Sequence, residues 1–319
     1  MRTPLQSLLP GAAALAIFSA CAPSRPVAVP TPAPLPTVSA APTTRVPALE
    51  RVIDAPPAAV GMDPGLNARL DSIVGAAIDS GISPGAALVV ARYGRVVHQK
   101  GYGRVDWDPS ARPVDSTTMF DMASLTKVVA TTTAAMILEE EGKLKLDSTV
   151  AYYLPACGAV DSAKRAITVR MLVEHRGGLE AFAQLYKTFR GREQYLEQIA
   201  ARPMAYKPGE KMVYSDWDYI LMQLIIERIT GQPLDRFVAE RVFAPLGMRE
   251  TMFTPPASLK GNVAATEVDT LPETNRGPLQ GVVHDGNAWA IGGVSGHAGL
   301  FSSTRDVAAF VQMLLNGGK

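Results

Sequence analysis

In the stretch Phe120-Asp-Met-Ala-Ser124-Leu-Thr-Lys127-Val-Val-Ala130, a serine and a lysine stand at the start of an apolar helix. A lysine three residues after a serine lies on the same helical face, so its amine can approach the hydroxyl. Serine becomes a strong nucleophile only when a base removes its proton, and a lysine whose pKa is lowered can be that base. The structural alternative is a serine N-cap beside a lysine whose amine extends into solvent.

A second polar cluster, Met212-Val-Tyr214-Ser-Asp216-Trp-Asp-Tyr219, precedes another apolar helix. A tyrosine can relay protons near a nucleophile if an adjacent lysine ammonium lowers its pKa from about 10. Asp216 can orient that lysine. Two structural alternatives stay open: Tyr214 as a half-buried core residue, and Asp216 as the N-cap of the helix that follows.

Composition excludes several classes of protein. The chain has 319 residues, 47% of them hydrophobic, and a formal net charge of +1, without a basic stripe of the kind that binds nucleic acid. Its four histidines are scattered and its two cysteines are Cys21 and Cys157, so no spacing resembles a zinc or haem site. We therefore expect no metal, no cofactor and no nucleic-acid partner.

The N-terminal region predicts export. Residues 1–20 read as a signal peptide, because their apolar stretch is too short to span a bilayer and ends at Ile17-Phe-Ser-Ala-Cys21. That ending resembles a bacterial lipoprotein box, which would make Cys21 a lipidated anchor in a periplasmic or outer-membrane location; Phe18 is unusual there and leaves plain secretion open. Residues 21–47 read as a Pro/Ala-rich linker, and residues 48–319 as the folded domain.

Periodicity in the folded part predicts helices over 64–80, 126–141 and 304–315, among others. Residues 86–91 and 95–100 read as two strands that meet at Tyr93-Gly94, a hairpin signal. Farther along, the only candidates are short, such as Gly281-Val-Val283. Because a two-stranded hairpin normally needs at least one more strand, we expect part of the sheet to be missing.

These residues resemble one family, the serine hydrolases related to class C β-lactamases, penicillin-binding DD-peptidases and their esterase relatives. The resemblance covers roughly residues 60–319 and rests on four blocks in family order: Phe120 to Lys127, Glu174-His-Arg-Gly-Gly-Leu179, Pro208-Gly-Glu to Asp216, and Pro245-Leu-Gly-Met248. It implies an α/β (α+β) fold: a β-lactamase/transpeptidase-like antiparallel sheet flanked by helices, with a mostly helical insertion.

The resemblance also implies roles for individual residues. Ser124 would be the acylated nucleophile, Lys127 its base and Tyr214 the proton relay. The family usually has Asn where Asp216 stands, which argues against β-lactam chemistry more than against ester or peptide cleavage. A third box, Lys/His-Thr/Ser-Gly on an edge strand, has one local candidate, His297-Ala-Gly299, which would contact substrate together with Asp216; the alternative is that His297 is a loop residue beside the cleft.

The resulting hypothesis is an exported serine hydrolase that cleaves an ester, an amide or a peptidoglycan-like substrate by acylation of Ser124. One alternative is a non-catalytic cell-wall or penicillin-binding protein that keeps the fold. A second is an inactive fragment, since the family's terminal strands are expected beyond Lys319.

Overall fold

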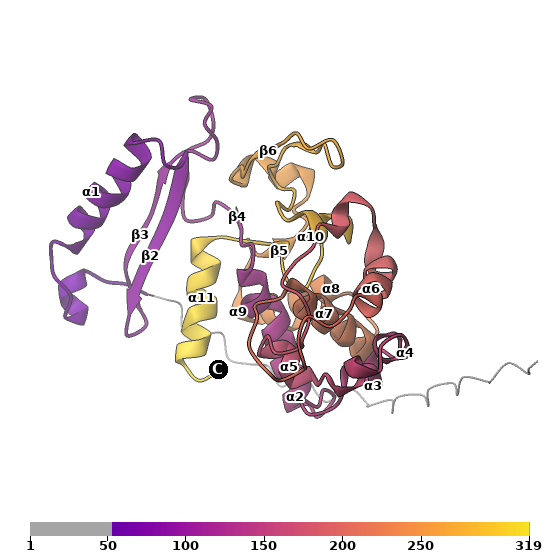
Figure 1. Ribbon diagram of the computed structural model, residues 1–319. Helices are drawn as coiled ribbons and strands as arrows, with labels where there is room; N and C mark the ends of the chain where they lie inside the picture. The colour runs from indigo at the N-terminus through magenta and orange to yellow at the C-terminus, as the bar shows by residue number, and fades with distance from the viewer. Residues whose placement is uncertain (1–52, 319) are drawn as a thin grey trace, which may run out of the picture. The chain divides into compact units, whose positions relative to one another are not determined.

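The computed structural model describes residues 53–318, and its first sheet is built around the predicted hairpin (Figure 1). Strands β2 (Gly85–Arg92) and β3 (Arg95–Gly103) pair antiparallel, and β1 (Ile53–Asp54) pairs parallel with β3, giving the order β1-β3-β2. Tyr93 and Gly94 have φ values of 52° and 72°, the left-handed pair that a tight two-residue hairpin turn requires. The hairpin prediction is confirmed.

Two amphipathic helices pack against this sheet. Helix α1 (Leu66–Asp79) contacts β3, and α11 (Thr304–Leu315) contacts β2, so the hairpin lies between them in Figure 1. Ser303 caps α11 by accepting a hydrogen bond from the Asp306 amide at 3.3 Å. Ile73 of α1 is 66% exposed, so this apolar residue lies outside the packed face of the helix.

A small second sheet leads the chain into the serine stretch. It consists of β4 (Phe120–Asp121), β8 (Leu300–Ser302) and β5 (Met252–Phe253), in the order β4-β8-β5. Residues Gly281–Val283, expected as a strand, are not one; β6 (Val268–Asp269) and β7 (Gly277–Pro278) form a separate pair nearby in the sequence.

The helical part contains the largest apolar core. The serine-proximal helix begins as the π-helix η2 (Lys127–Thr132) and continues as α2 (Thr133–Glu140). Helix α7 (Asp216–Thr230) is buried on most sides, as its run of apolar residues requires. The other helices of this part are α3 (Val150–Tyr153), α4 (Ala156–Ala159), α5 (Val169–Val173), α6 (Gly191–Ala201), α8 (Leu234–Val238), η5 (Ala239–Phe243) and α9 (Ala244–Leu246).

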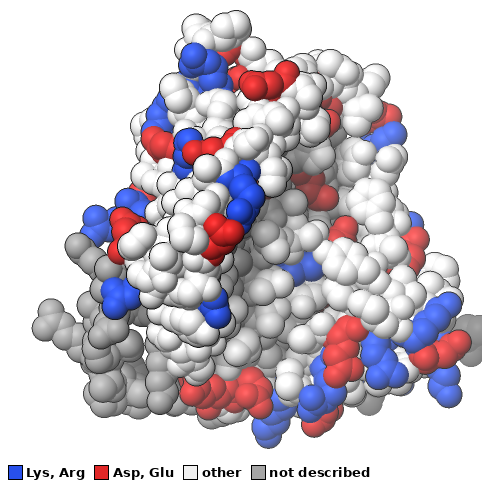
Figure 2. Space-filling view, turned by 90° about the vertical axis from the view of Figure 1, so that its left-hand side faces the viewer, with Lys and Arg blue, Asp and Glu red and all other residues white. Residues whose placement is uncertain are grey.

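Short helical turns complete the chain: η1 (Pro57–Val60), η3 (Ser162–Ala166), η4 (Leu185–Lys187), η6 (Ala257–Asn262) and α10 (Gly286–Ala290). Figure 2 shows basic and acidic side chains interspersed on the visible face rather than gathered by sign, in keeping with the formal net charge of +1. Within residues 53–318, every helix is too short or too polar to cross a bilayer. The predicted signal peptide, linker and Cys21 lie outside the described residues.

Candidate active site

Ser124 lies in a tight turn between β4 and the helix that carries Lys127. The residue before it, Ala123, has φ = 44°, a left-handed conformation that alanine rarely adopts. Asp121 holds this turn in place, because its Oδ1 accepts a hydrogen bond from the Ala123 amide at 2.8 Å. The Ser124 side chain is exposed, and within the described residues its backbone N–H has no hydrogen-bond partner. A strained turn that presents an exposed hydroxyl and a free amide is typical of a nucleophile.

Lys127 is only 3% exposed, and its amine contacts three acceptors. Nζ lies 3.2 Å from Ser124 Oγ, 2.8 Å from Asp216 Oδ1 and 3.1 Å from the His297 carbonyl oxygen. The predicted proximity of Ser124 and Lys127 is therefore confirmed, and an extended, solvent-exposed lysine is not what the structure contains.

Asp216 is the first residue of α7, and Ser215 occupies the N-cap position, so the expectation that Asp216 caps the helix is off by one residue. The Asp216 carboxylate instead forms a largely buried ion pair with Lys127, whose side chains are 16% and 4% exposed respectively. Its position at a helix N-terminus, where the helix dipole is positive, further stabilises the carboxylate. The negative charge of Asp216 therefore lies beside the Lys127 amine, which the sequence predicts to be the base.

Tyr214 covers the same amine with its ring. The Lys127 Nζ lies 4.7 Å from the Tyr214 ring centroid, and the ring packs against His175 at a centroid distance of 4.5 Å. Tyr214 is 48% exposed, and across residues 53–318 its hydroxyl makes no hydrogen bond. The tyrosine is thus at the site with its hydroxyl available, and its role as a proton relay stays a prediction.

A buried histidine–aspartate pair supports Tyr214, and the sequence pattern did not reveal it. His175 has φ = 55°, a left-handed conformation, and its Nδ1 accepts a hydrogen bond from the Ser215 amide at 3.2 Å. Asp218 Oδ2 lies 3.3 Å from the same nitrogen, and burial raises the Asp218 pKa to about 6. The available signal was an acidic residue, Asp218, inside an otherwise apolar helix.

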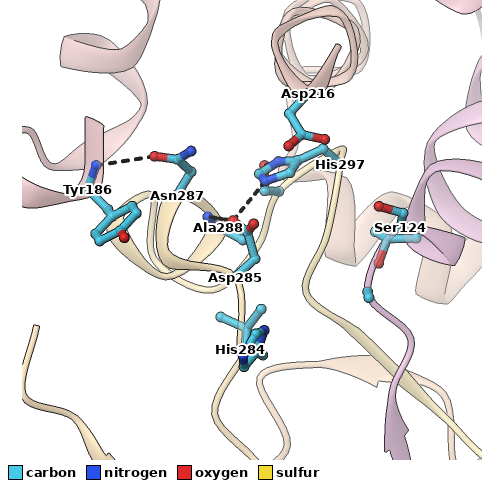
Figure 3. Close-up of polar contacts among 12 residues, drawn as sticks. Ser124, Tyr186, Asp216, His284, Asp285, Asn287, Ala288 and His297 are labelled. Atoms are coloured by element: carbon cyan, nitrogen blue, oxygen red, sulfur yellow. Dashed lines mark hydrogen bonds and ion pairs between the residues drawn. The ribbon is translucent and has the colours of Figure 1, made fainter. Parts of the chain in front are cut away.

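His297 belongs to the loop before β8, and its ring lies beside Asp216 and Asp285 (Figure 3). Its Nε2 is 2.9 Å from Asp285 Oδ1, a contact drawn in Figure 3. Its Nδ1 is 2.7 Å from Ser295 Oγ. The ring is 1% exposed. This placement agrees with the alternative of a loop residue, and the substrate contact expected for His297 stays a prediction.

Gly299 is also buried in that loop. It has φ = 113°, and a Cβ there would lie 2.5 Å from the Gly293 carbonyl oxygen, so the position admits only glycine. Gly299 therefore shapes the loop next to the site. Whether it meets a substrate stays a prediction.

Asp285 joins the loop to its surroundings. Its Oδ1 accepts hydrogen bonds from His297 and from the Ala288 amide at 2.7 Å, where Asp285 caps α10 (Figure 3). Burial would raise the pKa of Asp285, but the neighbouring His297 and these hydrogen bonds lower it to about 2. Nothing in the local sequence pattern links Asp285 to a histidine twelve residues later.

Oxygen and nitrogen atoms of Asp216, Asp285 and His297 lie within 4.8 Å of one another, close enough to act as three ligands of a divalent cation. The same atoms already have partners, however: the Lys127 amine on Asp216, and Asp285 and Ser295 on the two ring nitrogens. The protein's own groups therefore already satisfy this cluster.

Comparison with protein families gives the ancestry of this arrangement. The model of the β-lactamase family matches residues 70–319. This chain belongs to the β-lactamase family. As a member of that family it is indicated to be a serine hydrolase, and the resemblance seen in its four sequence blocks is confirmed.

Individual relatives of this β-lactamase-family chain agree. A protein of Escherichia coli strain K12 described as a putative D-alanyl-D-alanine carboxypeptidase is 38% identical over 284 residues, covering 78% of this chain and 64% of its own length. This chain thus spans somewhat less than two thirds of that relative.

Two solved structures share the fold. EstCE1, described as a hydrolase with promiscuous acyltransferase activity, is 27% identical with a TM-score of 0.65, over 79% of this chain and 72% of its own. A mutant class C β-lactamase aligns with a TM-score of 0.67 at 21% identity, over 80% and 66% of the two chains. The expected β-lactamase/transpeptidase-like fold is thereby confirmed.

Proposed function

We propose that this chain is an exported serine hydrolase that forms an acyl-enzyme on Ser124, with Lys127 as the base and Tyr214 as the proton relay. The observation that carries the proposal is the 3.2 Å contact between Lys127 Nζ and Ser124 Oγ, made by a buried amine and an exposed hydroxyl. That distance is within the reach required of a general base.

In the proposed reaction, Ser124 Oγ attacks the substrate carbonyl carbon while its proton passes to the unprotonated Lys127 amine. The carbonyl electron pair moves onto oxygen, and the Ser124 N–H, free within the described residues, is one donor for that oxyanion. Collapse of the intermediate expels the leaving group, which takes a proton through the Tyr214 hydroxyl. Water then attacks the acyl-enzyme and releases Ser124.

The substrate class proposed is a peptide ending in D-alanyl-D-alanine, or a close peptidoglycan-like analogue. The support is the name of the 38% identical relative, a putative D-alanyl-D-alanine carboxypeptidase. Export fits such a substrate, since peptidoglycan lies outside the cytoplasm, and lipidation of Cys21 would hold the enzyme near it. Metabolic labelling with an alkyne fatty acid, with Cys21→Ser as the control, tests the anchor.

The test of the reaction is covalent labelling of the full chain. A fluorophosphonate and a penicillin are each incubated with the protein and with Ser124→Ala, and intact mass is recorded together with release of D-alanine from a D-alanyl-D-alanine peptide. Mass gain and D-alanine release that are both lost in Ser124→Ala support the proposal. A folded chain that gains no mass contradicts it. Labelling without D-alanine release contradicts the substrate class and leaves an esterase-type hydrolase.

A further inference from the structure

The contacts of the Lys127 amine define a stereochemical requirement. An unprotonated amine has two N–H bonds and one lone pair. To act as the base, it must direct that lone pair toward the Ser124 hydroxyl, which donates its proton there. Asp216 Oδ1 at 2.8 Å and the His297 carbonyl oxygen at 3.1 Å can only accept hydrogen bonds. If they take the two N–H bonds, the lone pair is left facing Ser124 Oγ. The His297 carbonyl is therefore as necessary to this orientation as the carboxylate.

The position of that loop is fixed by its neighbours. The Gly296 carbonyl accepts from Thr131 Oγ1 at 2.7 Å, and the Leu300 amide donates to Thr126 Oγ1 at 3.1 Å. A Cβ at Gly296 would lie 2.1 Å from the Tyr219 carbonyl oxygen, so the loop rests directly on α7. These contacts lie on either side of the peptide unit that follows His297 and do not themselves set the direction of its carbonyl.

The His297 side chain supplies the missing constraint. Both ring nitrogens are engaged, by Asp285 at 2.9 Å and by Ser295 at 2.7 Å, and the ring is buried. Asp285 is in turn fixed as the cap of α10, and the neighbouring His284 amide donates to Asp121 Oδ2 at 2.8 Å. Asp121 also holds the Ala123 amide, so one set of hydrogen bonds connects the serine turn to the loop that orients the lysine.

We propose that Asp285 and His297 are positioning residues for this reaction: their hydrogen bond fixes the His297 carbonyl, which orients the Lys127 amine toward Ser124. The proposal rests on the proposed function of Ser124 and Lys127. The buried His297-Ala-Gly299 loop then orients the Lys127 base instead of contacting the substrate. Its chemical content is a hydrogen bond, so variants that keep the hydrogen bond must keep the function.

Two matched pairs of variants test this in the full chain. Asp285→Asn keeps the α10 cap and an acceptor for His297, whereas Asp285→Ser keeps the cap but is too short to reach the ring. His297→Gln keeps a group that can reach Asp285, whereas His297→Leu does not. His98→Leu is the control for burial, since His98 is a buried histidine of β3 bonded to Tyr102, away from Ser124 and Lys127.

The measurement is the time course of Ser124 labelling by a fluorophosphonate over a range of concentrations, which separates the first-order acylation constant from the probe's dissociation constant. Asp285→Ser and His297→Leu are expected to lower the acylation constant by about 100-fold, the effect of a displacement of roughly 1 Å, with an unchanged dissociation constant. Asp285→Asn, His297→Gln and His98→Leu are expected to stay close to the natural chain.

Other outcomes overturn the proposal. Acylation by Asp285→Ser at the natural rate does so directly, and a change confined to the dissociation constant would mean that these residues contact the substrate instead. If the natural chain is not labelled at all, the proposed function fails, and a crystal structure of Asp285→Ser decides the positioning question by itself. Loss of the contact between Lys127 Nζ and the His297 carbonyl supports the proposal, and a preserved contact rejects it.

Discussion

Among the described residues, Lys127 and Lys164 are both buried, at 3% and 1% exposure, but their surroundings differ in kind. The Lys164 amine donates to the carbonyls of Ile199 at 3.0 Å, Ala200 at 2.6 Å and Arg202, at the C-terminal end of α6. These carbonyls accept hydrogen bonds from the amine and form the negative end of the α6 dipole, which the lysine complements. Burial lowers the Lys164 pKa, but the hydrogen-bond partners of this amine are backbone carbonyls, which have no proton to donate.

Lys127 is surrounded by a carboxylate, one carbonyl and a hydroxyl that can give up its proton. The comparison shows that burial and satisfied hydrogen bonds do not by themselves make a lysine reactive. What distinguishes the two is a partner that is both exposed to a substrate and able to donate, namely Ser124. Four substitutions test this distinction.

The largest effect is expected for Lys127→Ala. Removal of a general base lowers the rate by about 10²–10⁴-fold, and labelling of Ser124 by a fluorophosphonate should fall by that amount. Circular dichroism and thermal unfolding should show that the variant is folded. A variant that is folded and labelled at the natural rate would mean that Lys127, like Lys164, is structural.

Asp216→Asn should lower stability. The exchange leaves the buried Lys127 side chain without its ion-pair partner, so the unfolding free energy is expected to fall by about 3–5 kcal/mol at neutral pH. Denaturant unfolding of the variant and of the natural chain measures the effect. An unchanged unfolding free energy would indicate that the Asp216 carboxylate does not stabilise the buried lysine.

Lys164→Met should affect stability alone. The carbonyls at the end of α6 lose a buried donor, which is expected to reduce the unfolding free energy by about 3 kcal/mol, while the acylation constant of the folded protein stays unchanged. Urea unfolding beside the labelling assay measures both quantities. A lower acylation constant in a folded variant would show that the two buried lysines are coupled and would weaken the comparison.

The smallest effect is expected for Asp218, which lies beneath His175 and Tyr214. Its pKa is raised from 3.8 to about 6, so the native state binds the proton more tightly than the unfolded chain does. The stabilisation from protonated Asp218 is therefore complete below about pH 4 and is lost as pH rises through 6, on the order of 3 kcal/mol in total.

Asp218→Asn removes this titration. The natural chain should lose stability relative to the variant between about pH 4 and pH 6, as measured by urea unfolding at several pH values. Asp306 has a pKa raised to about 6 as well, but its contribution cancels in the difference between the two proteins. A constant difference across this range would contradict the raised pKa of Asp218.

Much of the local structure was predictable from the sequence. The period of the apolar residues predicted α11 over 304–315 and the helix after Ser124, and Tyr93-Gly94 predicted the hairpin turn, because these depend on neighbours a few residues away. The strand predicted at Gly281–Val283 is not present, because a short apolar run has no partner specified in the sequence. The 66% exposure of Ile73 depends on which distant segments pack against α1, and the local pattern does not specify them.

The spacing of Ser124 and Lys127 was enough to predict their pairing, because three residues along a helical turn place both side chains on one face whatever surrounds them. The other partners of the Lys127 amine depend on the tertiary structure. Asp216 comes from α7, the carbonyl comes from the loop of His297, and Asp285 holds that loop from the start of α10. These contacts join residues up to 170 positions apart, and their geometry depends on how the helices and loops pack, which no local pattern encodes.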